Sequence, residues 1–198
     1  EMELEDAALK EYTQVIVREA DRLQALVDRM LAPHRSAPKP ESVNIHEICE
    51  HVQRLVLAEF PSGLTVVRDY DASIPEFQGD RERLIQAVLN IVRNAAQALR
   101  PQMQEGTACI TLRTRVVRQI TLGRQRHKLA LELLVIDNGP GIAPGLLEQV
   151  FYPLVTGKAE GTGLGLTLAQ SFVQQHHGLI ECESAPGHTV FRVTIPLV

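Results

Sequence analysis

Two asparagines stand one helical turn apart in a helical pattern that is otherwise largely apolar. Asn90 and Asn94 are four residues apart, so a helix places their amide groups on one face. Asparagine is a poor residue for a helix interior, which makes such a pair unusual. Neutral amide oxygens suit a hard cation such as Mg²⁺ that also keeps phosphate oxygens and water as ligands. The pair indicates a candidate cation site, and two surface asparagines on a tolerant helix are the alternative.

A second patch places an acid at the end of an apolar strand, with glycines directly after it. The strand ends at Ile136, and Asp137 is followed by Gly139 and Gly141. Glycine permits positive φ angles and the close approach of a ligand to the backbone. A carboxylate at this place can accept a hydrogen bond from an exocyclic amine. Because Asp-Asn-Gly is also a common turn, the patch is weak evidence by itself.

Alternating glycines precede the next predicted helix, at about 164–177. Gly161, Gly163 and Gly165 alternate with Thr162 and Leu164. The backbone N–H groups at a helix N-terminus attract an anion, so this run is a candidate phosphate site. Its spacing excludes a Walker loop, G-x-x-x-x-G-K-[ST], and a Rossmann loop, G-x-G-x-x-G after a strand. A flexible glycine hinge is the alternative.

The elements that position these patches follow from hydrophobic periodicity and turn residues. Helices are predicted at 4–31, from 42–44 to 60–63, at 80–99 and at 164–177, and strands at 64–70, 107–118, 127–136, 179–184 and 189–196. They alternate without strict βαβ order, which predicts an α+β fold, a two-layer α/β sandwich. We divide the chain into a helix with its linker, 1–36, and a domain, 37–198. The narrow apolar stripe of helix 4–31 predicts a partner helix, and packing onto its own domain is the alternative.

Composition limits the function classes. The chain has 198 residues, 44% of them hydrophobic, and a net charge of -4, which argues against nucleic acid as a partner. We see no apolar stretch approaching ~20 residues and no signal peptide, so we expect no membrane segment and a cytoplasmic protein. Cys49, Cys109 and Cys182 lack CxxC spacing and are expected to be reduced. Because the sequence starts inside a helical run at Glu1, we expect it to be a fragment.

Together, the order and spacing of the patches resemble the catalytic ATP-binding domain of sensor histidine kinases, in the superfamily of gyrase, Hsp90, histidine kinases and MutL. The motifs that carry the resemblance are the N box (Asn90 to Asn94), the G1 box (Asp137-x-Gly139-x-Gly141), the F box (Phe151-Tyr152-Pro153), the G2 box (Gly161-x-Gly163-x-Gly165) and a closing segment (Gly187 to Phe191). The resemblance covers about 37–198 and implies a Bergerat-type fold. It also implies that the leading helix is the second helix of a dimerisation and phosphotransfer hairpin. Longer runs, among them NIVRNAAQAL, DNGPGI and GTGLGL, are similar to the nitrogen-regulation (NtrB) family of these kinases.

The resemblance implies ATP and Mg²⁺ as ligands, with a role for each matched residue. Asp137 would recognise the adenine amino group, and Gly139 and Gly141 would let the nucleotide lie against the backbone. Asn94 would hold Mg²⁺ between the phosphates, and Asn90 would support a phosphate or a metal-bound water.

Further roles fall on the segment that includes the glycine run. That run, Gly161 to Gly165 with Thr162, Gly163 and Leu164, would cap the phosphates. Thr189 would sit beside the base. Lys158 is a candidate phosphate cation, with a solvated lysine as an equal alternative. Many sensor kinases place a basic residue and an aromatic after the N box, whereas this chain has Gln97 and Ala98.

Position 90 also bears on the reaction. ATPases of this superfamily generally place a glutamate base there, and an asparagine cannot accept a proton as a general base. A neutral imidazole already offers a lone pair, so the sequence favours histidine phosphorylation over hydrolysis, and a gyrase- or MutL-like ATPase is disfavoured.

None of the seven histidines fits a phosphoacceptor. His46 is followed by Glu47 but lies after the linker, and we expect it to be an ordinary helix-surface residue. We also disfavour a zinc site at His46, Cys49 and His51. His176 is expected to cap its helix as an imidazolium. We therefore expect the fragment to bind nucleotide without labelling itself.

The resemblance also implies partners: a response regulator, NtrC, a PII signalling protein, and a second copy of the chain in a homodimer of the full kinase, which can also act as a phosphatase. A regulatory module that uses nucleotide only as a structural ligand for PII binding is the alternative function.

Overall fold

The computed structural model of the chain describes residues 39–156 and 162–197. The predicted helix at 4–31, its linker, Lys158 and Gly161 lie outside the described residues. The elements, in chain order, are β1 (Glu41–Val43), α2 (Ile45–Glu59), β2 (Leu64–Asp69), β3 (Phe77–Gly79), α3 (Arg81–Ala98), α4 (Arg100–Glu105), β4 (Ala108–Leu122), β5 (Gln125–Asp137), α5 (Pro144–Leu147), α6 (Gly165–Gln175), β6 (Leu179–Ala185) and β7 (His188–Leu197).

Five strands form the main sheet, in the order β2-β4-β5-β7-β6. β2 runs parallel to β4, and the other neighbours are antiparallel. The long hairpin of β4 and β5 lies near the centre, and β5 is flanked on its other side by β7. This order places the end of β5 beside the start of β7, which are far apart in the sequence.

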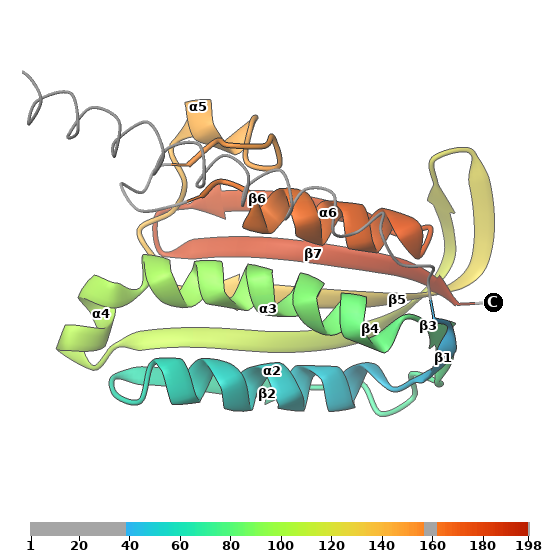
Figure 1. The fold of residues 1–198 in the computed structure, drawn as a ribbon, viewed down its shortest axis with the longest axis horizontal. Coiled ribbons are helices and arrows are strands. Elements are labelled where there is room, and N and C mark those ends of the chain that lie inside the picture. Colours follow the sequence, from blue (N-terminus) through green and yellow to red (C-terminus); the bar gives the residue numbers. More distant parts are fainter. Residues whose placement is uncertain (1–38, 157–161, 198) are drawn as a thin grey trace, which may run out of the picture. The chain divides into compact units, whose positions relative to one another are not determined.

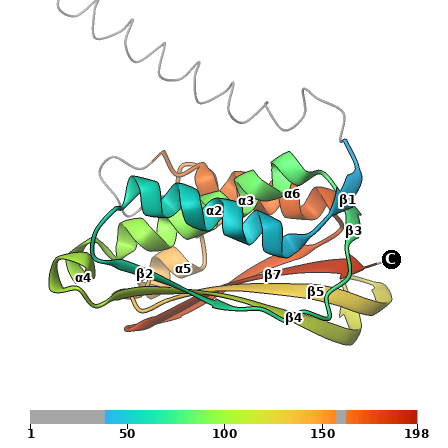
Figure 2. The same cartoon turned by 90° about the horizontal axis from the view of Figure 1, so that it is seen from below.

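Helices α2, α3 and α6 lie side by side over one face of this sheet (Figures 1 and 2). Their apolar side chains meet those of the strands in one core, which includes Leu84 and Ile91 of α3 and Leu133 of β5, each at most 1% exposed. Burying such a side chain fully contributes about 1.5–3 kcal/mol. The predicted core face of the asparagine helix and the predicted two-layer sandwich are confirmed.

Side-chain caps fix where two of the helices begin. Asn44 Oδ1 accepts a hydrogen bond from His46 N at 2.9 Å at the start of α2, and Asp80 Oδ1 accepts one from Arg83 N at 3.1 Å at the start of α3. Each bond satisfies a backbone donor that has no partner within the helix. The predicted starts of both helices are therefore confirmed.

Other boundaries differ from the prediction. β1 and β3 form a two-stranded antiparallel sheet that the sequence did not indicate, because three-residue strands carry no readable alternation. β4 and β5 continue to Leu122 and from Gln125, beyond the predicted ends. The predicted connection at Leu122 to Arg124 is thus a tight turn between longer strands, with Gly123 at φ 60°.

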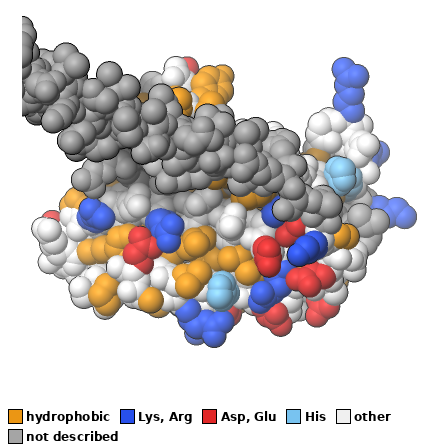
Figure 3. All heavy atoms as spheres, in the orientation of Figure 1, with side chains coloured by type: hydrophobic (Ala, Val, Ile, Leu, Met, Phe, Trp, Pro, Cys, Tyr) orange, Lys and Arg blue, Asp and Glu red, His pale blue; other side chains and the backbone are white. Residues whose placement is uncertain are grey.

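The face of the described region that Figure 3 shows carries charges of both signs. In the view of Figure 3, acidic and basic side chains alternate with apolar ones over the helical layer. No helix in the described ranges combines the length and the apolar character needed to cross a membrane.

Candidate functional site

Helix α3 carries the asparagine pair toward the start of α6. Asn90 and Asn94 are both half-buried. A Cβ atom built on Gly165, the first residue of α6, would lie 3.8 Å from Asn90 Cγ and 3.9 Å from Asn90 Oδ1. The structure therefore brings two of the sequence patches together, the amide pair and the glycine run.

The acid at the end of β5 is buried beneath its own turn. Asp137 is 4% exposed, and its Oδ1 accepts a hydrogen bond from Gly139 N at 2.9 Å. A Cβ atom on Gly139 would come within 2.7 Å of that oxygen and 3.8 Å of Ala98 Cβ. The turn after Asp137 thus lies against the C-terminal end of α3, about two helical turns beyond Asn90. All three sequence patches share this end of the domain.

Thr189 lies directly beside the acid. Strand β7 pairs Thr189 with Asp137 across the sheet, and Thr189 is 3% exposed. Residues opposite each other in antiparallel strands point to the same face. The carboxylate and the hydroxyl therefore face the helical layer together, as expected for groups that share a ligand.

Two glycines of the site have backbone conformations that a side chain would strain. Gly141 has φ 86° and Gly163 has φ 64°. A Cβ atom on Gly163 would lie 2.5 Å from the carbonyl carbon of Leu154, and Leu154 N donates to Gly163 O at 3.1 Å. These glycines are required by the protein's own backbone, whereas a Cβ atom on Gly165 would make only ordinary contacts with Asn90.

The rest of the glycine run divides into buried and exposed residues. Leu164 is 2% exposed, so its side chain belongs to the interior and only its backbone can face a ligand. Thr162 is exposed. Phe151 of the predicted F box packs edge-on against Phe191 at a ring separation of 6.3 Å and is tied to α6 because Thr167 Oγ1 donates to its carbonyl oxygen at 3.0 Å.

The half-buried thiol of Cys182 lies within the electrostatic influence of Asp137. Burial, with the nearby charges of Asp137 and Glu183, raises the pKa of Cys182 to about 12. This thiol stays neutral at physiological pH and serves as an apolar neighbour of the acid.

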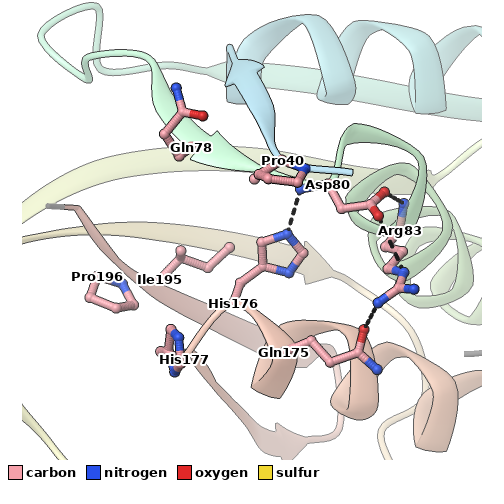
Figure 4. Close-up of a pocket in the computed structure, with 10 residues that line it drawn as sticks. Pro40, Gln78, Asp80, Arg83, Gln175, His176, His177, Ile195 and Pro196 are labelled. Carbon is pink, nitrogen blue, oxygen red and sulfur yellow. Dashed lines mark hydrogen bonds and ion pairs between the residues drawn. The ribbon is translucent and has the colours of Figure 1, made fainter. Parts of the chain in front are cut away.

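A cavity of about 190 Å³ lies at the other end of α3 and α6 (Figure 4). Asp80 and Arg83 line it from the start of α3, and Gln175 and His176 from the end of α6. Arg83 lies 3.3 Å from Asp80 and hydrogen bonds to Gln175. These polar groups bond to one another, so they join the two helices and are not arranged around a ligand.

His176 corrects one prediction. Its Nε2 lies 2.8 Å from Asp80 N, and its Nδ1 lies 2.7 Å from Phe172 O. A backbone N–H can only donate, so Nε2 accepts, and Nδ1–H donates to the carbonyl oxygen. His176 does bond the last turn of α6, but as a neutral imidazole and not as the expected imidazolium.

His46 is likewise less exposed than predicted. Its ring stacks on Tyr70 at a centroid distance of 4.8 Å, and its Nε2 lies 3.0 Å from Thr114 Oγ1. Desolvation by burial lowers its pKa, against the opposing charges of Asp71 and Glu50. His46 is therefore a packed, hydrogen-bonded residue and not an ordinary surface histidine.

Two residues of the site escaped the sequence reasoning. Ser184 Oγ accepts from Ile142 N at 2.8 Å and lies 2.9 Å from Thr189 Oγ1. Asn138 Oδ1 accepts a hydrogen bond from Cys109 N, and Asn138 Nδ2 donates one to Thr107 O, each at 2.8 Å. These two bonds hold the turn after Asp137 against the start of β4. The Pro-Gly turn at 186–187 could have revealed Ser184, because a tight hairpin there pairs residue 184 with residue 189.

Comparison with known proteins defines the class first. Residues 79–198, more than half of the chain, match the family described as "Histidine kinase-, DNA gyrase B-, and HSP90-like ATPase". The chain belongs to this family of ATPases. Within it, the chain is similar to "Sensory histidine kinase/phosphatase NtrB" of Salmonella typhimurium, with 50% identity over 195 residues. That match covers 98% of this chain and 54% of the relative, so the chain spans about half the length of the curated relative.

Solved structures agree on the fold. A mycobacterial sensor histidine kinase, MprB, is 25% identical with a TM-score of 0.64 over 80% of this chain and 98% of that chain. Histidine kinase ThkA, solved in complex with the response regulator protein TrrA, matches with a TM-score of 0.67 at 23% identity, over 96% of this chain and 52% of that chain. Both support the Bergerat-type sandwich predicted from the sequence.

Proposed function

We propose that this chain is the ATP-binding catalytic part of a nitrogen-regulation sensor histidine kinase, and that it phosphorylates a histidine outside the chain. The observation that carries the proposal is the buried carboxylate of Asp137, at the same end of the domain as Asn94 and Gly165. An acid beside a hydroxyl suits the donor edge of adenine, and the helix start at Gly165 suits phosphate.

Each matched residue then has a task. Asp137 accepts a hydrogen bond from the adenine amino group, with Thr189 beside it, and Gly139 lets the base approach the backbone. The amide oxygens of Asn90 and Asn94, half-buried on one helix face, are a donor set that fits Mg²⁺. When bound, Mg²⁺ neutralises the charge of the phosphates.

The chemical step is phosphoryl transfer to nitrogen. The lone pair of the acceptor imidazole forms a bond to the γ-phosphorus, the bond to the bridging oxygen breaks, and its electrons leave on ADP. Asn90 cannot take a proton from water, so this chain offers no general base at the position where the ATPases have one. This favours a histidine acceptor over hydrolysis.

The similarity to NtrB supports the wider parts of the proposal. The printed name of the Salmonella relative, a kinase/phosphatase, supports a phosphatase activity in the full protein. We further propose a division of the chain at 36/37, a homodimer of a cytoplasmic full kinase, transfer to an NtrC-type response regulator, and regulation by a PII-type protein. The complex of ThkA with TrrA is a solved example of a protein of this fold with a response regulator.

Incubation with γ-labelled ATP tests the proposed reaction. The chain is incubated alone, and then with the other half of the Salmonella relative added as acceptor. We expect an acid-labile, alkali-stable label on the added half and none on this chain. Such a label on this chain alone, or steady ATP hydrolysis without the acceptor, would contradict the proposal. A calorimetric titration with ATP and ADP, with and without Mg²⁺, establishes binding independently.

A further inference from the structure

Three strands present a row of polar side chains at the candidate site. Asp137 of β5 pairs with Thr189 of β7, and Thr189 pairs with Ser184 of β6. Residues in register face the same side of the sheet, and neighbouring strands lie about 4.8 Å apart, so the row spans roughly 10 Å. Ser184 stands at the end of this row that is farthest from the acid.

The hydroxyl of Ser184 joins two parts of the site. Its oxygen accepts from Ile142 N at 2.8 Å, and the same oxygen lies 2.9 Å from Thr189 Oγ1. A serine hydroxyl has one donor and two acceptor positions. With one acceptor position filled by Ile142, the Ser184 hydroxyl can still donate to Thr189 Oγ1 or accept from it, and either bond fixes the direction of the Thr189 hydroxyl.

The turn from Asp137 to Ile142 is fastened to the β6–β7 hairpin. Gly187 N donates to Gly139 O at 2.8 Å, and a Cβ atom on Gly141 would meet the carbonyl of Ala185 at 3.0 Å. The bond from Ile142 to Ser184 adds a second hydrogen bond between the turn and the hairpin, made by a side chain and therefore open to substitution. The position of this hairpin sets the position of the turn that would receive the base.

We propose that Ser184 is a positioning residue that sets the base selectivity of the nucleotide site, acting through Thr189 and the turn that ends at Ile142. The inference rests on the proposed ATP-binding function. Without the serine hydroxyl, Thr189 can rotate, and Ile142 N–H loses its acceptor. The site then no longer holds one fixed pattern of donors and acceptors, which is what distinguishes adenine from an analogue with a carbonyl group at the same position.

The test compares ATP with inosine triphosphate, which carries a carbonyl group in place of the adenine amino group. Calorimetry measures both dissociation constants for the wild type, Ser184→Ala and Ser184→Thr. We expect the wild type to prefer ATP by about 100-fold or more, because a site built to bond an amino group rejects the analogue. Ser184→Ala should weaken ATP about tenfold and inosine triphosphate less than about threefold, so the preference falls.

Controls separate selectivity from general damage. Ser184→Thr keeps the hydroxyl and should keep the preference. Thr194→Val removes another buried hydroxyl of β7, on a residue 2% exposed and about 17 Å along the strand from Thr189, and should change neither constant. Hydrogen exchange of the Ile142 amide should quicken in Ser184→Ala, while that of Gly187 stays the same.

The outcomes are distinguishable. An equal loss for both nucleotides in Ser184→Ala, or no loss for either, would overturn the role of Ser184 and leave the proposed function intact. Failure of the wild type to bind ATP would overturn both. A preference that falls in Ser184→Ala and returns in Ser184→Thr supports the assignment.

Discussion

Replacing Asp137 by asparagine tests the adenine assignment most directly. The change exchanges one carboxylate oxygen for an NH₂ group at nearly constant volume. Asp137 is 4% exposed and its Oδ1 accepts from Gly139 N at 2.9 Å. The amide oxygen of asparagine can take that place and keep the bond to Gly139. Its NH₂ group then faces the adenine amino group, so that two donors meet.

The size of the effect follows from the bond that is lost. A hydrogen bond to a charged group contributes about 1.5–3 kcal/mol, and every ~1.4 kcal/mol changes an affinity tenfold. We therefore expect Asp137→Asn to weaken ATP roughly 10- to 150-fold. The free energy of unfolding should change by less than about 1 kcal/mol, because the volume and the bond to Gly139 are preserved.

Asp80→Asn is the matched control. Asp80 is another buried carboxylate, 8% exposed, and its two oxygens accept from Arg83 N and Lys39 N at 3.1 Å each. One oxygen becomes a donor in the variant, so we expect a loss of about 1 kcal/mol in the free energy of unfolding. ATP affinity should stay within about twofold, because Asp80 lies about 21 Å from Asn94 along α3.

Calorimetric titration with Mg·ATP and urea unfolding followed by circular dichroism measure both quantities for both variants. The reasoning predicts opposite patterns, affinity lost at Asp137 and stability lost at Asp80. If Asp137→Asn bound ATP as tightly as the wild type, or if Asp80→Asn weakened ATP as much as Asp137→Asn, the base would not lie at Asp137.

Two further predictions concern a glycine and the acid dependence of stability. Gly165→Ala adds a methyl group in ordinary contact with Asn90, so the free energy of unfolding should stay the same or rise by up to about 1 kcal/mol. ATP affinity should fall at least about tenfold, because the methyl group occupies the approach to the backbone. Unchanged affinity in the titration would refute this. Hydrogen bonds from Ser73, first from its hydroxyl and then from its amide, lower the pKa of Asp71, and at Asp80 the backbone bonds from Lys39 and Arg83 lower the pKa against the opposing desolvation. These carboxylates stabilise the fold fully above about pH 4, which is their pKa in the unfolded chain, and the contribution is lost as the pH falls through the lower pKa of the folded state. Urea unfolding at pH 7 and pH 3 should show this loss of stability. Equal stability at the two pH values would contradict the prediction.

Local signals predicted the elements, because the residues that set them are neighbours in the sequence. Asn44 and Asp80 are N-caps that precede apolar periodicity, and both helices begin at the residue after the cap. The end of β4 was misjudged because charged and polar residues interrupt its alternation, and Gln119 has φ 54° within the strand. β4 continues through these residues because it pairs with β5, and the β-propensity of single residues does not report such pairing.

The sequence predicts the site as a set of patches, but it does not predict the hydrogen bonds that connect residues far apart in the sequence. Residue types and spacing predict Asp137, Asn94 and Gly165 as residues of the site. The role of His176 depends on Asp80, a partner 96 residues away, and this contact turned an expected imidazolium into a neutral ring. Ser184 depends on Ile142, 42 residues away. Such pairings come from the strand order and helix packing, which no local pattern contains.

These hydrogen bonds between residues far apart in the sequence have a consequence for how the domain folds. The bonds from Ile142 to Ser184 and from Asp80 to His176 close loops of 42 and 96 residues, and contacts so distant in sequence form slowly and late. A chain that has collapsed but has not yet inserted β7 between β5 and β6 has no Thr189 beside Asp137. Nucleotide at 100 times its dissociation constant would then favour the completed fold by about 2.7 kcal/mol, because partly folded forms have no site to fill.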